Sequence, residues 1–217
     1  MKKIYAVNGS PRNNGNTANI LQHALAGAAT TGAETELIHL GRLNFSGCRS
    51  CFACKLKDGD NFGRCALRDG LTPVLEKLIH ADGIIFGTPI YFGAESGLFR
   101  NFMERLFFPL LKYTNPPSSA APKKMETAFV YTMNIQEEAI TDYGYREYLE
   151  KCKTFPQLIF GSSDVETLYV CDTWQFDDYS KYESSLFNAE HKLEVRKHIF
   201  PIYQKKAFEL GRKTALK

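Results

Sequence analysis

The chain has 217 residues, of which 44% are hydrophobic and 24% are charged, and its formal net charge at pH 7 is +3. This composition is ordinary for a globular protein, so it excludes a disordered chain and a fibrous repeat, and the small charge gives no reason to expect a nucleic-acid partner. The longest apolar uncharged stretch, residues 83–94, is shorter than the roughly 18 residues that a membrane-spanning helix needs, so we expect no membrane partner.

Along the chain, short apolar runs alternate with amphipathic helical patterns. The expected strands are residues 4–7, 36–40, 83–87, 128–133 and 167–171. Most of these runs are continuously apolar, which is typical of strands covered on both faces. The expected helices show apolar stripes at residues 20–28, 71–79 and 98–106. The alternation predicts an α/β fold: a three-layer sandwich around a five-stranded parallel sheet of order 2-1-3-4-5, with helices on both faces.

Several segments interrupt this rhythm. Residues 44–70 form a polar insertion that carries cysteines, and residues 115–124 have the composition of a surface loop. Residues 135–148 and 174–182 are rich in aromatic and acidic side chains with weak periodicity, and residues 189–217 predict a long terminal helix. No repeat or domain boundary is evident, so we expect one domain over residues 1–217. Too few apolar residues precede Asn8 for a signal peptide, so we expect a cytoplasmic protein.

The segment NGSPRNNGNT, residues 8–17, connects the first expected strand to the first expected helix. It should therefore lie at the carboxyl edge of the sheet, where such folds bind ligands. A helix N-terminus offers unpaired N–H groups, Ser10, Asn16 and Thr17 add polar donors, and Arg12 adds a positive charge. The segment contains no carboxylate, and it lacks both the Walker lysine and the dinucleotide G-x-G-x-x-G spacing. It predicts a site for one terminal phosphate; the alternative is an ordinary turn with a helix cap.

The segment GTPIYFGAESG, residues 87–97, follows the third expected strand, which should lie beside the first. Pro89 stiffens the turn, Tyr91 and Phe92 supply flat apolar surface, and Gly93 exposes backbone N–H. A flavin ring needs such a wall and such donors. The alternative is that the two aromatic residues belong to the core.

These two segments closely resemble the NADPH-dependent FMN reductase and iron–sulfur flavoprotein branch of the flavodoxin-like superfamily. The resemblance is strong over residues 1–110. It implies that Ser10, Arg12, Asn16 and Thr17 bind the phosphate of FMN, and that Pro89, Ile90, Tyr91, Phe92 and Gly93 line the ring. It also places residues 132–134 at a loop that touches the flavin in related proteins. The flavin edge in this branch often lies at a subunit interface, so we expect a homodimer or a tetramer.

The insertion contains a compact group of cysteines: Cys48, Cys51, Cys54 and Cys65 in the spacing C-x2-C-x2-C-x10-C. Three closely spaced thiolates and a fourth further along are typical of a [4Fe–4S] site, and iron–sulfur flavoproteins carry a compact motif of this kind. In those proteins the last gap is shorter. Free or redox-active thiols, or a zinc site, are the alternatives.

Together these features predict an enzyme, an FMN-binding, NAD(P)H-dependent oxidoreductase that passes electrons through FMN to a small-molecule or protein acceptor. No side chain is expected to act as an acid or a base. A flavodoxin-like electron carrier or redox sensor, in one form a ferredoxin-linked iron–sulfur flavoprotein, is the alternative function.

Overall fold

The computed structural model of the protein describes residues 1–217. Its centre is a parallel sheet in the spatial order β2-β1-β3-β7-β8. The strands are β1 (Lys3–Asn8), β2 (Glu34–His39), β3 (Gly83–Tyr91), β7 (Glu126–Thr132) and β8 (Glu166–Val170). Numbered along the chain, these five long strands have the predicted order 2-1-3-4-5. One difference is β4 (Ala94–Glu95), a short strand that pairs antiparallel with the end of β3 and that the sequence did not predict.

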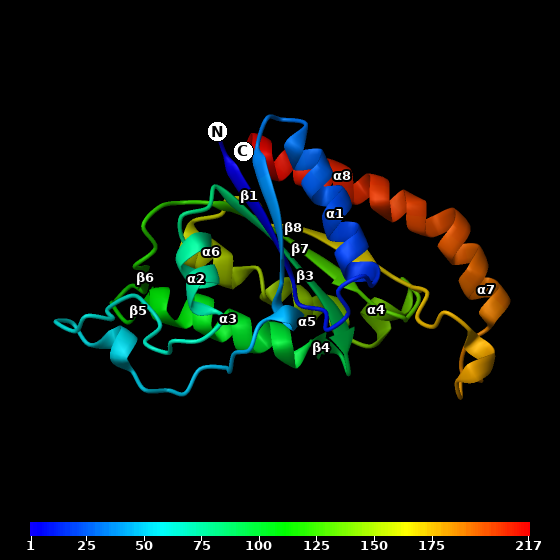
Figure 1. The fold of residues 1–217 in the computed structure, drawn as a ribbon, viewed down its shortest axis with the longest axis horizontal. Coiled ribbons are helices and arrows are strands. Elements are labelled where there is room, and N and C mark those ends of the chain that lie inside the picture. Colours follow the sequence, from blue (N-terminus) through cyan, green and yellow to red (C-terminus); the bar gives the residue numbers. More distant parts are fainter.

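Helices cover both faces of the sheet, and each face has its own apolar core (Figure 1). On one face, α1 (Asn16–Ala29) packs along α8 (Phe200–Leu216). The two backbones come so close that a Cβ atom on Gly27 would lie 1.9 Å from the carbonyl oxygen of Phe208. On the other face lie α2 (Thr72–Leu78), α3 (Gly97–Leu110), α5 (Tyr145–Lys151) and α6 (Thr154–Phe160). The packing of α1 against α8 fixes the N-terminus of α1 at the carboxyl edge of the sheet.

The irregular segments differ from their predictions in detail. The expected terminal helix is α7 (Ala189–Glu194) and α8, joined by the π-helical turn η4 (Val195–Ile199). The expected loop 115–124 includes β6 (Ser118–Ser119), which pairs with β5 (Leu111–Lys112). The weakly periodic region 135–148 contains α4 (Ala139–Asp142) and the start of α5, and α6 follows it. Short 3₁₀ turns are η1 (Leu40–Arg42), η2 (Ala53–Lys55) and η3 (Tyr179–Lys181). No helix is long and apolar enough to span a membrane.

Candidate functional site

The loop between β1 and α1 is held by hydrogen bonds between neighbours in the chain. The Oδ1 atom of Asn8 accepts from the backbone N–H of Ser10 at 3.0 Å, and Ser10 Oγ accepts from the N–H of Arg12 at 3.1 Å. Helix α1 then begins at Asn16, without a side chain capping its N-terminus and without an acidic residue in its first turn. Since the first N–H groups of a helix have no intrahelical acceptor, this N-terminus can receive an anion.

The same loop is locked to the N-terminus of α3. Ser96 caps α3 by accepting from the N–H of Phe99, and its hydroxyl donates to the carbonyl oxygen of Gly9 at 2.7 Å. A Cβ atom on Gly9 would lie 2.7 Å from the ring of Phe99, which is completely buried. Gly9 therefore allows the loop to lie directly on the core, and the helix that follows β4 supports the predicted phosphate segment.

The second predicted segment forms a hairpin, in which Ile90 and Tyr91 pair with Glu95 and Ala94. The two residues at its turn, Phe92 and Gly93, both have positive φ, 51° and 82°. This is the pattern of a type I′ turn, in which a non-glycine residue such as Phe92 carries backbone strain. The side chain of Phe92 is fully exposed. Phe92 therefore lies at the tip of the hairpin, outside the wall that it was expected to form.

The carboxyl ends of β7 and β8 complete the site. The hydroxyl groups of Thr17 and Thr132 lie 2.7 Å apart, so the first turn of α1 is bonded to the end of β7. Asn134 donates from its side chain to Gln175 Oε1 at 2.6 Å, which joins the segments that follow β7 and β8. The sequence did not single out Thr173 and Gln175. Their position just after the fifth expected strand, whose carboxyl end meets the same edge, was the available signal.

A cleft opens between these segments, and its volume, including the part open to solvent, is about 600 Å³. Seven of the nine predicted cofactor residues line it, and Phe92 and Gly93 do not. The lining residues are Ser10, Arg12, Gly15, Asn16, Thr17, Pro89, Ile90, Tyr91, Thr132, Met133, Asn134, Thr173 and Gln175. Arg12 is the one charged residue among them, so the cleft suits an anionic ligand.

Two of the predicted phosphate ligands also bond to the segment that follows β8. The Arg12 guanidinium donates to the carbonyl oxygen of Gln175 at 2.8 Å, and the Asn16 side chain donates to that of Trp174 at 2.7 Å. These bonds hold residues 174 and 175 against the N-terminus of α1. Arg12 keeps further N–H donors, because a guanidinium carries five.

A cluster of charged side chains around Asp172 holds the segments at the carboxyl edge of the sheet in place. Lys192 of α7 is 3% exposed, donates to Asp172 and Asn134, and brings a positive charge beneath the segment after β7. Asp172 has a φ of 53°, and His191 is its second partner. Burial acts to raise the pKa of Asp172, but the hydrogen bonds from Lys192 and His191 outweigh it, so the pKa lies below its ordinary value. The Asp172 carboxylate therefore stays ionised, and its bonds to Lys192 and His191 fix α7 to the site.

A second buried group supports the hairpin. The carboxylate of Glu95 in β4 has no solvent exposure and accepts from Tyr148 Oη at 3.1 Å and from Cys152 Sγ at 2.9 Å. Burial, together with this hydrogen bond, raises the pKa of Cys152 to about 12. Cys152 therefore remains a protonated thiol that connects α5 to the hairpin, in agreement with the structural role expected for a buried cysteine.

A family model described as "NADPH-dependent FMN reductase" matches residues 2–150. The chain belongs to this family. Among curated relatives, iron–sulfur flavoproteins of Methanocaldococcus jannaschii and Archaeoglobus fulgidus are 38% and 40% identical over 103 residues, which is 48% of this chain. The matched region is 51% and 48% of those relatives, so the chain spans about half the length of the curated relatives it matches.

Solved structures extend the likeness to the whole fold of this FMN reductase family member. An NAD(P)H:quinone oxidoreductase from Methanothermobacter marburgensis has a TM-score of 0.70 at 13% identity, with 98% of each chain covered. An azoreductase from Bacillus anthracis has a TM-score of 0.65 at 14% identity and covers 98% of this chain and 100% of its own. At such identities the likeness shows the flavodoxin-like fold.

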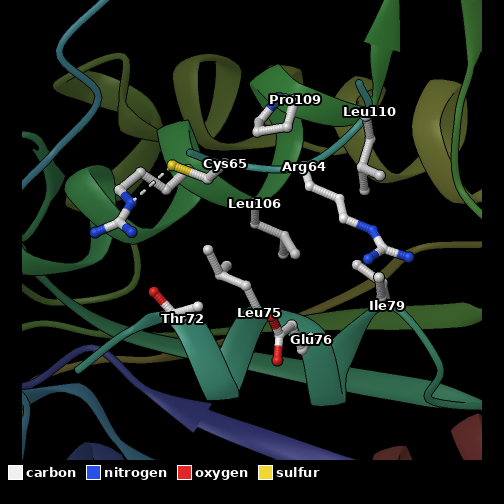
Figure 2. Close-up of a pocket in the computed structure, with 11 residues that line it drawn as sticks. Arg64, Cys65, Thr72, Leu75, Glu76, Ile79, Leu106, Pro109 and Leu110 are labelled. Atoms are coloured by element: carbon white, nitrogen blue, oxygen red, sulfur yellow. Dashed lines mark hydrogen bonds between the residues drawn. The ribbon is translucent and has the colours of Figure 1, made fainter. Parts of the chain in front are cut away.

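The names of the curated relatives raise the question of whether the cysteine insertion fits an iron–sulfur cluster. The Sγ of Cys65 lies 3.3 Å from Nε of Arg105, beside a crevice between α2 and α3 (Figure 2). Cys54 is buried, whereas Cys51 is exposed. No three side chains of His, Cys, Asp or Glu form a set of metal ligands. As they are placed, the four cysteines do not fit a [4Fe–4S] cluster or a zinc ion.

Arg105 of α3 holds the cysteine insertion, residues 44–70, against the fold. Its guanidinium is 1% exposed and donates to the carbonyl oxygens of Ser46 and Leu67 and to the carboxylate of Asp69. One buried cation from α3 therefore ties the two ends of the insertion together. The crevice beside it is lined by Leu75, Leu106 and Leu110 among others (Figure 2), and it shares no lining residue with the cleft at the sheet edge.

Proposed function

We propose that the cleft at the carboxyl edge of the sheet binds FMN, and that the chain is an FMN-dependent oxidoreductase reduced by NAD(P)H. The observation that carries the proposal is that one cleft gathers the β1–α1 loop, the end of β3 and the end of β7, with Arg12 as the only charge in its lining. Membership in the NADPH-dependent FMN reductase family supports the same cofactor and the same electron donor.

The phosphate end of FMN fits the N-terminus of α1. Ser10 and Thr17 offer hydroxyl groups, Asn16 an amide, Arg12 a guanidinium, and the first turn its N–H groups. The Thr17 hydroxyl is buried and hydrogen-bonded to that of Thr132, so its oxygen is positioned before the ligand arrives. The absence of a carboxylate removes the charge that would repel a phosphate dianion.

The ring end fits the hairpin. Pro89, Ile90 and Tyr91 line the cleft, and residues 132–134 line it beside them, because Pro89 pairs with Thr132 in the neighbouring strand. The positive charge of Arg12 and the lack of acidic lining also favour the anion that forms when the flavin is reduced. Bound FMN would supply the atom that accepts a hydride from the nicotinamide and would then donate electrons to a small-molecule or protein acceptor. In this proposal the chain binds and orients FMN and the nicotinamide, and no side chain is assigned as a catalytic acid or base.

A second copy of the chain is part of the proposal. Phe92 is fully exposed at the turn that follows Tyr91, and Tyr143 on the neighbouring α4–α5 connection is 67% exposed. A second copy that covered these aromatic residues would also close the open side of the cleft and shield the ring from water. Light scattering coupled to size exclusion would detect the homodimer or tetramer; a monomer at micromolar concentration would contradict it.

Anaerobic stopped-flow spectroscopy tests the function directly. The chain is loaded with FMN and mixed with NADPH, and the flavin absorbance band is followed. Loss of the band within milliseconds to seconds supports a reductase. Retained FMN without reduction by NADPH or NADH would favour the electron carrier or redox sensor, and a chain that binds no FMN would contradict both.

A further inference from the structure

A second cavity adjoins the cleft on the outer side of the phosphate loop. Its volume, including the part open to solvent, is about 1120 Å³. Arg12, Gly15, Asn16 and Gln175 line both spaces, so they form the partition between them. A ligand whose phosphate lay at this partition could extend into either space.

The far wall of this cavity is a preformed aromatic cluster. Trp174, Phe176 and Tyr182 line it. The rings of Phe176 and Tyr182 are stacked, with centroids 4.2 Å apart and planes 13° apart. Behind them, Tyr179 is buried, lies 4.8 Å from Trp174 between ring centroids, and accepts from the N–H of Gln175. The aromatic side chains are therefore packed against one another before any ligand binds, and they present flat apolar faces of the kind on which a purine stacks.

The charges in this cavity favour an anion. Arg196 of η4 and Arg12 both line the cavity, and neither guanidinium has a carboxylate within 4.0 Å. Arg196 is held over the ring of Phe200 at 4.3 Å and donates to Asn16 Oδ1 at 3.3 Å. Asp177 is the one acidic residue in the lining. Two arginines against one carboxylate leave a net positive space, which suits a phosphate.

We propose that this cavity binds the adenosine phosphate part of a dinucleotide, with the phosphate between Arg12 and Arg196 and the adenine against the aromatic wall. This inference rests on the proposed function, because that function supplies the dinucleotide to which the adenosine phosphate group belongs. It belongs either to FAD, bound in place of FMN, or to the nicotinamide dinucleotide that reduces bound FMN. Asn14 and Asn19 supply amides beside the wall that can bond to the edge of the adenine.

Trp174 is the only tryptophan in the chain, so its emission reports on the cavity wall. The first experiment adds ADP to the full-length chain, with and without FMN, and follows Trp174 emission and the heat of binding. The second compares the affinities of FMN and FAD for the flavin-free chain by calorimetry. FAD that binds about tenfold more tightly than FMN assigns the cavity to the flavin. Equal flavin affinities, with ADP that binds the FMN-loaded chain and is displaced by NADPH, assign it to the nicotinamide nucleotide.

Two variants and one control make the test specific. Arg196→Gln should lower the affinity for ADP, or the preference for FAD over FMN, by about tenfold. Tyr182→Ala, which leaves the cleft lining intact, should lower it by about fivefold. Lys197→Gln removes the same charge from the same turn, but its side chain is exposed, pairs with Glu194 and does not line the cavity, so it should have no effect.

The outcomes separate this inference from the proposed function. If FMN binds but FAD binds no more tightly, and ADP produces neither heat nor a change in emission, the cavity is not an adenylate site and the inference is overturned. If FMN fails to bind, the proposed function fails, and ADP binding that depends on Arg196 would still support the cavity. ADP binding that is equally weakened by Lys197→Gln would overturn the site as placed.

Discussion

The hydroxyl groups of Thr17 and Thr132 lie 2.7 Å apart although 115 residues separate them in the chain. Thr17 belongs to the first turn of α1 and Thr132 is the last residue of β7, and both are buried. Since both side chains line the cleft, the bond joins the part proposed for the phosphate to the part proposed for the ring. This hydrogen bond therefore holds the two ends of the site together before a cofactor binds.

Replacing either threonine by valine should therefore affect stability and FMN binding together. Thr17→Val keeps the side-chain shape but leaves the Thr132 hydroxyl without its partner, so we expect a loss of about 1 kcal/mol in the free energy of unfolding and a similar loss in FMN affinity. Thr132→Val should destabilise by a similar amount. The double variant should lose less stability than the two single losses combined, because no buried hydroxyl is then unpaired. Urea denaturation of the four chains measures this; strict additivity would show that the bond contributes nothing.

Arg12→Ala should weaken FMN binding by about 1.5–3 kcal/mol, because it removes the only charged hydrogen-bond donor in the lining of the cleft. It also removes the bond to Gln175, so the segment after β8 should loosen. Arg49→Ala is the matched control, since Arg49 is exposed in the cysteine insertion and lines neither cavity. Fluorescence titration with FMN compares the two. Equal affinities in both variants would remove Arg12 from the phosphate site.

The sequence predicted the layout of the sheet and most of the cleft, for a physical reason. Strands buried on both faces are apolar throughout, and in a parallel sheet their carboxyl ends meet at one edge. The order of the five long strands and the gathering of Ser10, Thr17 and Pro89 follow from these two facts. Alternation of strand and helix was therefore sufficient to place residues far apart in the chain at one site.

Other features depend on tertiary contacts that a local sequence pattern does not predict. Phe92 reads as a wall residue, but its position in a tight turn with positive φ puts its side chain in solvent. Cys65 was predicted as the fourth cluster ligand although the gap before it is longer than in iron–sulfur flavoproteins, and in the structure its Sγ accepts from the buried guanidinium of Arg105. Trp174 and Tyr182 lie in a segment of weak periodicity, whose folding around the buried Tyr179 could not be inferred from spacing. The prediction of a single domain over residues 1–217 stays a prediction.

Gly9→Ala should destabilise the chain by about 1–3 kcal/mol and weaken FMN binding, because the new methyl group would collide with the buried ring of Phe99. Gly97→Ala is the control: an added Cβ meets nothing within 4 Å at the start of α3, so this variant should be neutral or more stable by up to about 1 kcal/mol. Thermal unfolding measures both changes. A Gly9→Ala chain as stable as the parent would mean that the loop does not depend on its contact with α3.

The placement of the cysteines predicts the metal content of the purified protein. Because Cys65 is held by Arg105 and the four thiols do not form a ligand set, we expect anaerobically purified chain to contain FMN and no stoichiometric iron or sulfide. Iron and acid-labile sulfide assays on that sample measure this, and a thiol titration under denaturing conditions checks that all six cysteines are reduced. About four iron and four sulfide per chain would show that the insertion rearranges around a [4Fe–4S] cluster.

The ion pair of Asp69 with Arg105 should determine how the insertion responds to acid. Burial acts to raise the pKa of Asp69, but hydrogen bonds from Arg105 and from the N–H of Leu71 outweigh it, so the pKa lies below its ordinary value. A carboxyl group whose pKa falls on folding stabilises the protein above its unfolded pKa of about 3.9, and this stability is lost as the pH drops through the folded-state pKa. Asp69→Asn should therefore cost about 2–3 kcal/mol at pH 7, where it leaves the Arg105 charge buried and unpaired.

The difference in unfolding free energy between the parent chain and Asp69→Asn should stay constant from about pH 7 to pH 5. It should shrink below about pH 4, because there the Asp69 carboxyl group of the unfolded parent takes up a proton before that of the folded parent does. Chemical denaturation across this range measures it. Glu36→Gln removes the carboxylate of a half-exposed pair with Lys77 and should cost less than about 0.5 kcal/mol at pH 7. If Asp69→Asn cost no more than Glu36→Gln, Arg105 would not depend on Asp69, and the hydrogen bonds to Ser46 and Leu67 alone would hold the insertion on α3.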